Sequence, residues 1–484
     1  MPLPVATNSV TSASTSPRSI AQLGGPRGWP LLGNLPQLRP IRIHRDIEAL
    51  CGRFGMLFRV WFGRQAVVVV ADHKLIETIL RDRPDGFRRP TVTTRISLEM
   101  GGKLGVFLAE GQAWRDQRRM VMAGLAPQAV KAYFPALLKV ALRLRARWQG
   151  AASQGQTIIL TDDLKRYSVD IAAGLALGTE SNTVDGFDDG LHQHLEVVMR
   201  AVARRSLSIL PYWRVLKLPA DRQLDRSIVA LRVTIDALIA AARERLIQTP
   251  ARRARPPNLL EAMLCAADDP DSRIDDATVA GNVSTMLLAA EDTTANTIAW
   301  LLYLLQRHPA ALERARNEVL RCLPDLGSAS IEQLDALDYI DACAQEAMRL
   351  KPVAPFMPLE AVRDTKVGNM QLPAGTMVWC VMRHDSVSAQ YFSQAQNFDP
   401  ERWLRQGEQA VSKAVSLPFG AGPRTCPGRY LALLEIKLAV ALLLGSFEIG
   451  AIDTVDGGEA QEVMGFTMSP MALQMRLRGL SEMT

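Results

Sequence analysis

The amino-acid sequence predicts a mainly α-helical protein with small β-sheets near both ends of the chain. Apolar residues recur at three- and four-residue spacing through most of the stretch from residue 72 to about residue 350, as in helices that bury one face. Shorter strand-like runs occur before and after this stretch, and no segment is repeated. With 484 residues, 48% of them hydrophobic, the chain can bury a large core.

Length alone suggests about three domains of roughly 150 residues each, but the composition shows no clear boundary between such units. We therefore expect one folded domain from residue 24 to residue 484. Residues 1–23 are rich in Ser, Thr and Pro and contain no long apolar run, so we expect a disordered N-terminal tail. Closely spaced Gly and Pro between residues 24 and 34 argue against a helix there.

The remaining elements follow in chain order. A helix is expected over 43–54, and a buried strand within 57–71, where four valines are consecutive. Helical spacing marks four longer segments, 137–148, 228–247, 275–307 and 310–321. The later elements are strand-like pieces at 367–372 and 377–381, an apolar helix after Gly428 and a final strand at 473–477.

The formal net charge is +6, and most basic residues are expected on a solvated surface. A basic patch for an acidic protein partner stays open. Nucleic-acid-binding proteins cluster basic residues with stacking aromatic residues, and no stretch does so here, so we expect no nucleic-acid partner. The longest later apolar stretch, 431–444, is too short to span a bilayer and contains Glu435 and Lys437. We therefore expect no transmembrane anchor.

The six cysteines are scattered and include no Cys-x-x-Cys pair, which argues against a disulfide framework and a zinc site. Most are expected to be small buried apolar residues. Cys426 differs, because it lies in a loop of three glycines and two prolines directly before an apolar helix. Backbone N–H groups and the helix dipole stabilise a thiolate there, and Arg424 and Arg429 add positive charge that can meet a carboxylate.

This loop resembles the haem-binding loop of the cytochrome P450 family, the haem-thiolate monooxygenases. The family pattern Phe-x-x-Gly-x-Arg-x-Cys-x-Gly is matched at all five specified positions, which are Phe419, Gly422, Arg424, Cys426 and Gly428. A chance match in a chain of this length has a probability of roughly one in ten thousand. The resemblance implies the cytochrome P450 fold, haem b as cofactor, and Cys426 as the ligand of the haem iron, with the other four residues binding the cofactor.

Glu346 and Arg349 match the family's Glu-x-x-Arg, a spacing that lets both side chains meet on a helix. Alone this signal is weak, since it recurs at 313–316 on an expected solvated helix face. The segment 398–403 resembles the family's Pro-Glu-Arg-Phe segment, with Trp in place of Phe. By resemblance, Glu346, Arg349 and Arg402 form a buried ionic network with a structural role.

Polar residues 291–294 interrupt the longest apolar helix pattern. Taken alone, they favour a helix break with an N-cap, or a solvated face. The segment 289–293 resembles the family motif in which an acid and a threonine deliver protons for dioxygen activation. The resemblance makes Asp292 and Thr293 the catalytic pair. Ala290 replaces the family's Gly, which would narrow the oxygen-binding groove slightly.

Trp114 and Arg118 match the family's Trp-x-x-x-Arg, and by resemblance they contact a haem propionate from one helix face. Without the cysteine loop, an amphipathic helix with a basic face would explain them equally well. Many relatives bind the second propionate with an arginine five residues before an aspartate. Leu359 occupies that position relative to Asp364, with Arg363 close by, so this contact is left unassigned.

By resemblance, the substrate pocket is lined by parts of 92–107, 286–290, 353–357 and 465–468. The candidate pocket residues are Phe107, Met286, Ala290, Phe356 and Phe466. The three phenylalanines fit a plain apolar core equally well. Because these side chains are mostly apolar, the expected substrate is a small or medium hydrophobic molecule.

The resemblance covers residues 24–477 and implies a monooxygenase that uses O2. No flavin or iron–sulfur domain is recognisable, so electrons would come from a separate ferredoxin with its reductase or from a flavin reductase, with NAD(P)H as the indirect source. Open alternatives are a peroxide-driven oxygenase, an isomerase or a dehydratase of the same fold, and a haem-binding sensor. A soluble bacterial member in the cytoplasm is expected. An organellar location is the alternative, because the N-terminal segment has arginines and no acid before Asp46.

Overall fold

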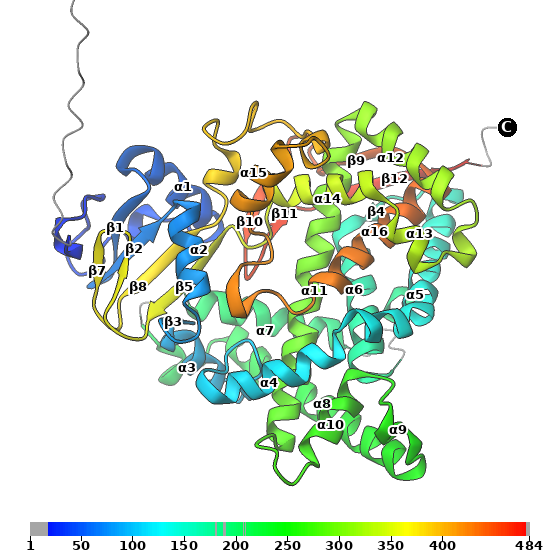
Figure 1. Ribbon diagram of the computed structural model, residues 1–484, viewed down its shortest axis with the longest axis horizontal. Coiled ribbons are helices and arrows are strands. Elements are labelled where there is room, and N and C mark those ends of the chain that lie inside the picture. The colour runs from blue at the N-terminus through cyan, green and yellow to red at the C-terminus, as the bar shows by residue number, and fades with distance from the viewer. Residues whose placement is uncertain (1–17, 180–181, 187–189, 207, 209, 481–484) are drawn as a thin grey trace, which may run out of the picture.

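The computed structural model describes residues 18–179, 182–186, 190–206, 208 and 210–480. Figure 1 shows a sheet-rich side at the left, carrying β1, β2, β5 and β8, and a larger helical side at the right. Helices α8, α9 and α10 project from the bottom of this view. The predicted class, mainly α with small β-sheets, is confirmed.

Most of the expected tail lies outside the described residues, but its last part is packed. Arg18 pairs with the backbone beside Met370, through an N–H···O bond of 2.8 Å to Asn369. Leu23 is only 3% exposed, in an apolar cluster with residues of the main sheet. The packed part of the chain therefore begins before Gly24, because Leu23 is buried against apolar residues of the main sheet.

The main sheet has the strand order β1-β2-β8-β5-β3. Its strands are β1 (Leu57–Phe62), β2 (Gln65–Val70), β8 (Met377–Val381), β5 (Phe356–Ala361) and β3 (Phe87–Arg88). Only β2 and β8 are parallel. The valines of β2 alternate: Val67 and Val69 pack with α1 (Ile43–Phe54), while Val68 and Val70 pack with α2 (His73–Arg81). Burial on both faces explains the unbroken valine run.

Three smaller sheets lie elsewhere in the described chain. They are β4 (Ile158–Ile159) with β12 (Gln474–Gly479) and β9 (Phe447–Asp453), β10 (Glu462–Met464) with β11 (Met468–Pro470), and β6 (Thr365–Val367) with β7 (Met370–Leu372). The last pair corrects one expectation. The piece 367–372 is not one strand but the bend of a hairpin, which turns at Gly368 with φ +57°.

The helices between the sheets follow the predicted periodicity. They are α3 (Thr91–Glu99), α4 (Gly111–Gly124), α5 (Pro127–Ser153), α6 (Leu160–Leu177), α7 (Leu191–Ser206), α8 (Pro219–Gln248), α9 (Ala251–Ala254), α10 (Leu259–Ala267), α11 (Asp276–Gln306), α12 (Pro309–Cys322), α13 (Ile331–Asp335), α14 (Asp338–Leu350), α15 (Glu408–Val415) and α16 (Arg429–Ser446). No helix within these described residues is long and apolar enough to cross a bilayer.

Helix α11 forms the centre of the helical side. Asp275 caps its first turn by accepting the Thr278 N–H at 2.8 Å. Its second half, from Thr294 to Leu305, is buried on all sides, which explains why apolar residues there lack strict periodicity. Around it pack α6, α14 and α16, of which α14 carries Glu346 and Arg349 and α16 directly follows the Cys426 loop. This packing brings segments far apart in sequence to one region.

Candidate functional site

The predicted cysteine loop lies between α15 and α16 and contains the short 3-10 turn η9 (Gly422–Arg424). The Cys426 N–H donates to the Phe419 carbonyl at 2.9 Å, and the Thr425 hydroxyl donates to the same oxygen at 3.3 Å. Gly422 has φ +71°, and a Cβ there would lie 2.7 Å from the Leu80 carbonyl oxygen. Glycine is required because the loop packs directly on the end of α2.

Cys426 is the one cysteine of the six whose side chain is exposed, although protein surrounds its sulfur closely. That desolvation raises the pKa of the thiol, while the Gly428 backbone N–H and the charges of Arg118 and Arg429 act to lower it. Desolvation is the larger effect, so the protein alone favours the thiol more than the loop sequence suggested. A metal ion bound to sulfur reverses this preference, because coordination deprotonates a thiol.

Helix α4 brings Trp114 and Arg118 to the cysteine loop. The Arg118 guanidinium donates to the Thr425 carbonyl at 2.6 Å. Trp114 is 6% exposed, and the Arg424 guanidinium stacks on its ring at 4.6 Å from the centroid. Trp114 and Arg118 therefore lie together with Arg424, although Arg424 is about 300 residues later in the sequence.

Two further arginines, Arg83 and Arg89, join this cluster and were not singled out from the sequence. Arg89 lies over the Phe107 ring at 3.9 Å, and the Nε atoms of Arg83, Arg89 and Arg424 are buried without a hydrogen-bond partner in the described structure. Burial lowers the pKa of Arg83 to about 10 and that of Arg89 well below its usual value. Their nearest acid is Glu110, which accepts from Arg424 and from the Arg89 backbone N–H.

The cluster of Arg83, Arg89, Arg118 and Arg424 thus carries more positive charge than Glu110 can neutralise. Buried guanidinium groups with unused N–H donors are costly, and carboxylates are their best partners. Haem b fits this arrangement, because its two propionates would supply the missing negative charge and Cys426 would supply a sulfur ligand. The only sequence signal for the two additional arginines is their density at 81–89, which by itself indicates a solvated basic segment.

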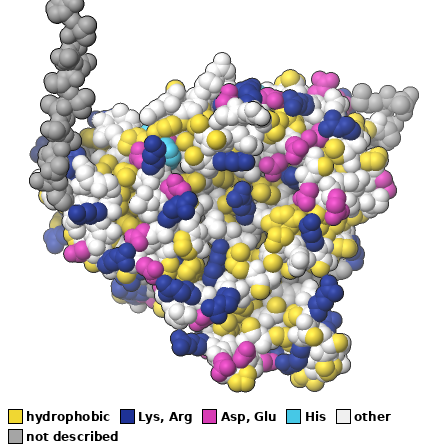
Figure 2. Space-filling model, viewed as in Figure 1, with side chains coloured by type: hydrophobic (Ala, Val, Ile, Leu, Met, Phe, Trp, Pro, Cys, Tyr) yellow, Lys and Arg dark blue, Asp and Glu magenta, His cyan; other side chains and the backbone are white. Residues whose placement is uncertain are grey.

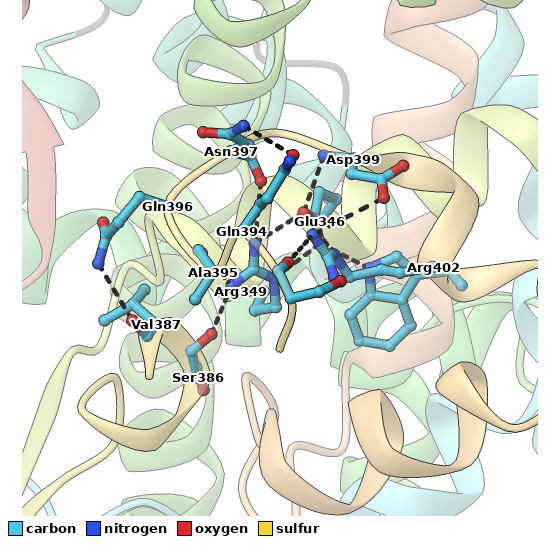
Figure 3. A network of polar contacts seen from close by, with 12 residues as sticks. Glu346, Arg349, Ser386, Val387, Gln394, Ala395, Gln396, Asn397, Asp399 and Arg402 are labelled. Atoms are coloured by element: carbon cyan, nitrogen blue, oxygen red, sulfur yellow. Dashed lines mark hydrogen bonds and ion pairs between the residues drawn. The ribbon is translucent and has the colours of Figure 1, made fainter. Parts of the chain in front are cut away.

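The predicted ionic network is present, and Figure 3 shows Arg349 and Arg402 converging on Glu346. Glu346 Oε1 accepts from Arg349 Nη2 at 2.7 Å and from Arg402 Nε at 3.0 Å. Glu346 Oε2 accepts from Arg349 Nε at 2.8 Å and from the Trp403 indole at 2.9 Å. Arg349 also donates to the carbonyls of Ser386, Ala395 and Asn397. The network therefore fastens α14 to the segment that precedes the cysteine loop.

Asp292 and Thr293 lie side by side on α11, but each contacts a different partner. The Thr293 hydroxyl donates to the Ala289 carbonyl at 2.7 Å. Asp292 Oδ1 lies 3.1 Å from Lys165 Nζ on α6, and both side chains are partly buried. Helix α11 continues through 291–294, so a helix break there is wrong. The helix continues because threonine hydroxyls bond to carbonyls one turn back rather than capping a new helix.

Glu291, directly before Asp292, is not on a solvated face. It is 1% exposed, and its Oε1 lies 2.6 Å from His192 Nδ1 on α7. Burial raises the pKa of Glu291, and contact with His192 opposes this rise without cancelling it. Neither His192 nor Lys165 belongs to a recognisable motif, so the sequence carried no signal for these partners.

The candidate pocket residues are brought together only in part. The rings of Phe107 and Phe466 lie 6.1 Å apart, and the Phe466 turn is joined to α11 by a 3.1 Å hydrogen bond from Asn296 to Thr467. Phe356 instead packs on Trp379 at 5.9 Å, within the apolar cluster of the main sheet. Met286 and Ala290 lie on α11 and are partly buried. The pocket as a whole stays a prediction.

Comparisons with known proteins identify the family. The sequence profile of the family described as Cytochrome P450 matches residues 23–477. Cyclooctat-9-en-7-ol 5-monooxygenase of Streptomyces melanosporofaciens is 28% identical over 430 residues, covering 88% of each chain. Carotene epsilon-monooxygenase of Arabidopsis thaliana is 26% identical, covering 81% of this chain and 74% of the relative. The crystal structure of the cytochrome P450DA heme domain superposes with a TM-score of 0.82 at 24% identity, covering 96% and 98% of the two chains.

This chain belongs to the cytochrome P450 family. The match spans nearly the whole chain and includes the cysteine loop, the α14 motif and the α11 motif. Within that family its relatives are named monooxygenases, and the chain is a cytochrome P450 monooxygenase.

Proposed function

We propose that this protein activates O2 at a haem b ligated by Cys426 and inserts one oxygen atom into a hydrophobic small molecule, using electrons from a separate redox partner. The exposed Cys426 thiol beside a set of under-neutralised buried arginines supports this proposal most directly. Such a pairing suits a flat cofactor that has a metal at its centre and two carboxylates at one edge.

In this proposal, Cys426 binds the iron, and Phe419, Gly422 and Gly428 shape the loop beneath it. Trp114, Arg118, Arg424 and the additional Arg83 and Arg89 bind the propionates. The haem supplies the oxidising chemistry when it is bound. The chain itself supplies the sulfur ligand, the hydrogen bonds that tune it, and the charges that orient the cofactor.

We assign proton delivery to Asp292 and Thr293. Thr293 presents a hydroxyl whose hydrogen bond to Ala289 is local and exchangeable, and Asp292 is held by Lys165 at a partly buried position. A carboxylate that can reach solvent and a hydroxyl beside it can pass protons into a site otherwise lined by apolar residues. The Glu346–Arg349–Arg402 network has a structural role, because it lies at 0–2% exposure and uses its donors internally.

A hydrophobic substrate is supported by two observations. The Phe107 and Phe466 rings approach one another close to the Arg89 side of the cluster. In addition, the relatives' names specify cyclooctat-9-en-7-ol and carotene, which are largely hydrocarbon. Apolar walls with few polar groups suit such ligands.

An electron donor with an acidic surface fits the face around the cysteine loop. Figure 2 shows numerous Lys and Arg side chains over the face that carries α2, α4 and the loop before α16. Arg81, Arg119 and Arg429 are among the exposed members. Opposite charges on the two partners accelerate their association and orient them. A ferredoxin with its reductase, or a flavin reductase, drawing on NAD(P)H, would suit this surface.

The ligand assignment is tested by the carbon monoxide difference spectrum of the reduced protein. We expect the red-shifted band of a thiolate-ligated haem in the wild type, and its loss in Cys426→Ala. Cys265→Ala is the matched control, since Cys265 is partly buried outside the loop, and it should keep the band. The proposal fails if the wild type lacks the band or if Cys426→Ala retains it.

The proton-delivery assignment is tested by the fraction of consumed NAD(P)H that appears as hydrogen peroxide instead of product. Thr293→Ala should raise that fraction. Thr297→Ala removes an equivalent bond, from its hydroxyl to the Thr293 carbonyl at 2.8 Å, and should leave the fraction unchanged. Equal peroxide release from wild type and Thr293→Ala would remove Thr293 from the pathway.

A further inference from the structure

Two adjacent carboxylates on α11 lie within ion-pair distance of basic side chains from two other helices. Glu291 is 1% exposed, with Oε1 2.6 Å from His192 Nδ1 of α7. Asp292 Oδ1 lies 3.1 Å from Lys165 Nζ of α6. The first contact is outside the motif match that assigned Asp292 and Thr293, and nothing in the proposed chemistry uses it. Its position beside Asp292 raises the question of what His192 does.

A third carboxylate completes the cluster. Glu196 of α7 lies 3.9 Å from Lys165 and also pairs with Arg200 one turn further along its own helix. Glu196 is thus divided between Arg200 and Lys165, and Lys165 makes its shorter contact with Asp292, at 3.1 Å. Burial opposes the charge of Lys165, but Asp292, and then Glu196 and Glu291, raise its pKa. Lys165 is therefore shared among carboxylates whose other partners differ, since Arg200 pairs with Glu196 and His192 with Glu291.

The remaining faces of α7 bring no further charge to His192 within the described residues. Toward α8, His194 contacts the Ser227 hydroxyl at 3.1 Å, and Arg204 and Arg205 pair with Asp221 at the other end of α7. On α3, the Glu99 carboxylate accepts a hydrogen bond from the Trp213 indole and forms an ion pair with Arg214. The groups that act on His192 are thus Glu291, Lys165 and Glu196.

His192 and Glu291 lie at ion-pair distance without an aligned hydrogen bond between them in the described structure, so the charge state of each depends on that of the other. Contact with Glu291 raises the pKa of His192 despite the opposing effect of burial. The free energy that this contact contributes to folding is fully present below the ordinary imidazole pKa of about 6.5. It is lost as pH rises through the raised pKa of His192. Once the proton is lost, a buried Glu291 carboxylate lacks its own cation and competes with Asp292 for Lys165, since unpaired buried charge is costly.

We propose that His192 is a positioning residue for proton delivery: by neutralising Glu291, it reserves Lys165 for the Asp292 carboxylate. This inference rests on the proposed role of Asp292. Loss of the His192 charge redirects Lys165 toward Glu291 and leaves Asp292 unheld. Coupling of electron use to product formation then depends on pH through a side chain on α7 that touches neither Asp292 nor Thr293.

The charge state is tested without turnover by NMR titration of histidine-labelled protein as its diamagnetic ferrous carbon monoxide complex. The chain has six histidines, and His192→Gln assigns the resonance. We expect the His192 midpoint above about 6.5 in the wild type and at or below that value in Glu291→Gln. An unchanged midpoint in Glu291→Gln would overturn the pairing.

The positioning role is tested by the peroxide fraction between pH 6 and pH 9. In the wild type it should rise with pH. In His192→Gln the peroxide fraction should be high at every pH, and at pH 6 it should exceed that of the wild type by roughly twofold or more. The reason is that a displaced proton donor loses part of the rate enhancement of general acid catalysis, which is on the order of 10²-fold. The double variant His192→Gln/Glu291→Gln should return to the low wild-type level, since no carboxylate then competes for Lys165.

His194→Gln, on the same helix two residues away, is the matched control and should follow the wild-type profile. The proposal is overturned if His192→Gln keeps the wild-type profile, or if the double variant fails to restore coupling. A merely structural defect at His192 would not be repaired by a second substitution. If Asp292→Asn leaves the peroxide fraction unchanged, the assignment of Asp292 itself fails, whatever the NMR titration shows.

Discussion

Replacing Glu346 by Gln isolates the charge at the centre of the buried network. Gln has the same shape, but its amide nitrogen must face donors wherever it points. Glu346 Oε1 accepts three hydrogen bonds, from Arg349, Arg402 and the Asp399 backbone, and Oε2 accepts two, from Arg349 and Trp403. The less disruptive amide orientation therefore sets an NH2 group against two donors, removes the counter-ion that Arg349 has in the described structure, and leaves Arg402 with only Asp399 at 3.8 Å.

The expected cost is about 3–5 kcal/mol, the usual result of removing one partner from a buried ion pair. Glu346 and Arg349 are fully buried, so solvent cannot replace the lost charge. Since folded proteins are stable by about 5–15 kcal/mol, this loss is a large fraction of the total. Trp403→Phe removes one of the five donors and should cost less, about 1.5–3 kcal/mol.

Denaturant unfolding of haem-loaded protein, followed by circular dichroism and by haem absorbance, measures both changes. Glu313→Gln is the matched control, because Glu313 has the same spacing to an arginine on an exposed helix face, and it should alter stability by less than about 0.5 kcal/mol. A loss below about 1 kcal/mol in Glu346→Gln would refute the reasoning that a desolvated charge holds α14 to the segment before the cysteine loop.

Two further predictions follow from the backbone and from buried charge. Gly422→Ala should reduce the haem retained per chain, because its Cβ would meet the Leu80 carbonyl at 2.7 Å; Gly420→Ala, with φ +72° but open space, controls for the backbone strain alone, and equal losses would contradict the steric explanation. Burial acts to raise the pKa of Glu462, but the contact with His44 and the charges of Arg383 and Lys351 hold it well below its usual range. The contribution of Glu462 to the free energy of unfolding is therefore present above about pH 4.3 and is lost as pH falls through its lowered pKa. Glu462→Gln should flatten the acid side of a plot of stability against pH. An unchanged acid side would show that Glu462 is not the source of that pH dependence.

Much of the cysteine site could be predicted locally. Gly422 and the prolines around Cys426 admit few backbone conformations, and the apolar helix after Gly428 begins where its sequence predicts. Likewise, the four-residue spacing of Trp114 and Arg118 places both on one helix face regardless of what that face meets. These features depend on residues close in sequence, which is why pattern alone identified them.

The charged partners could not be predicted in this way. Arg89 and Glu110 face Arg424 from a segment more than 300 residues earlier, and no local spacing connects them. His192 meets Glu291 because α7 packs beside α11, and a polar residue on α11 looked equally suited to a cap or a solvated face. Burial, which decides whether such a charge needs a partner, is a property of the assembled helices.

The sequence by itself determined the mainly α class, the haem-thiolate loop and the family, because local periodicity, turn residues and one ten-residue motif suffice for each. Only the tertiary structure decided which charges are buried and shared. It placed Arg83, Arg89 and Arg424 around Glu110 near Cys426, and Lys165 against Asp292 beside Thr293. Long-range packing removes solvent from these groups, and the loss of solvent converts ordinary surface charges into the electrostatics of a site.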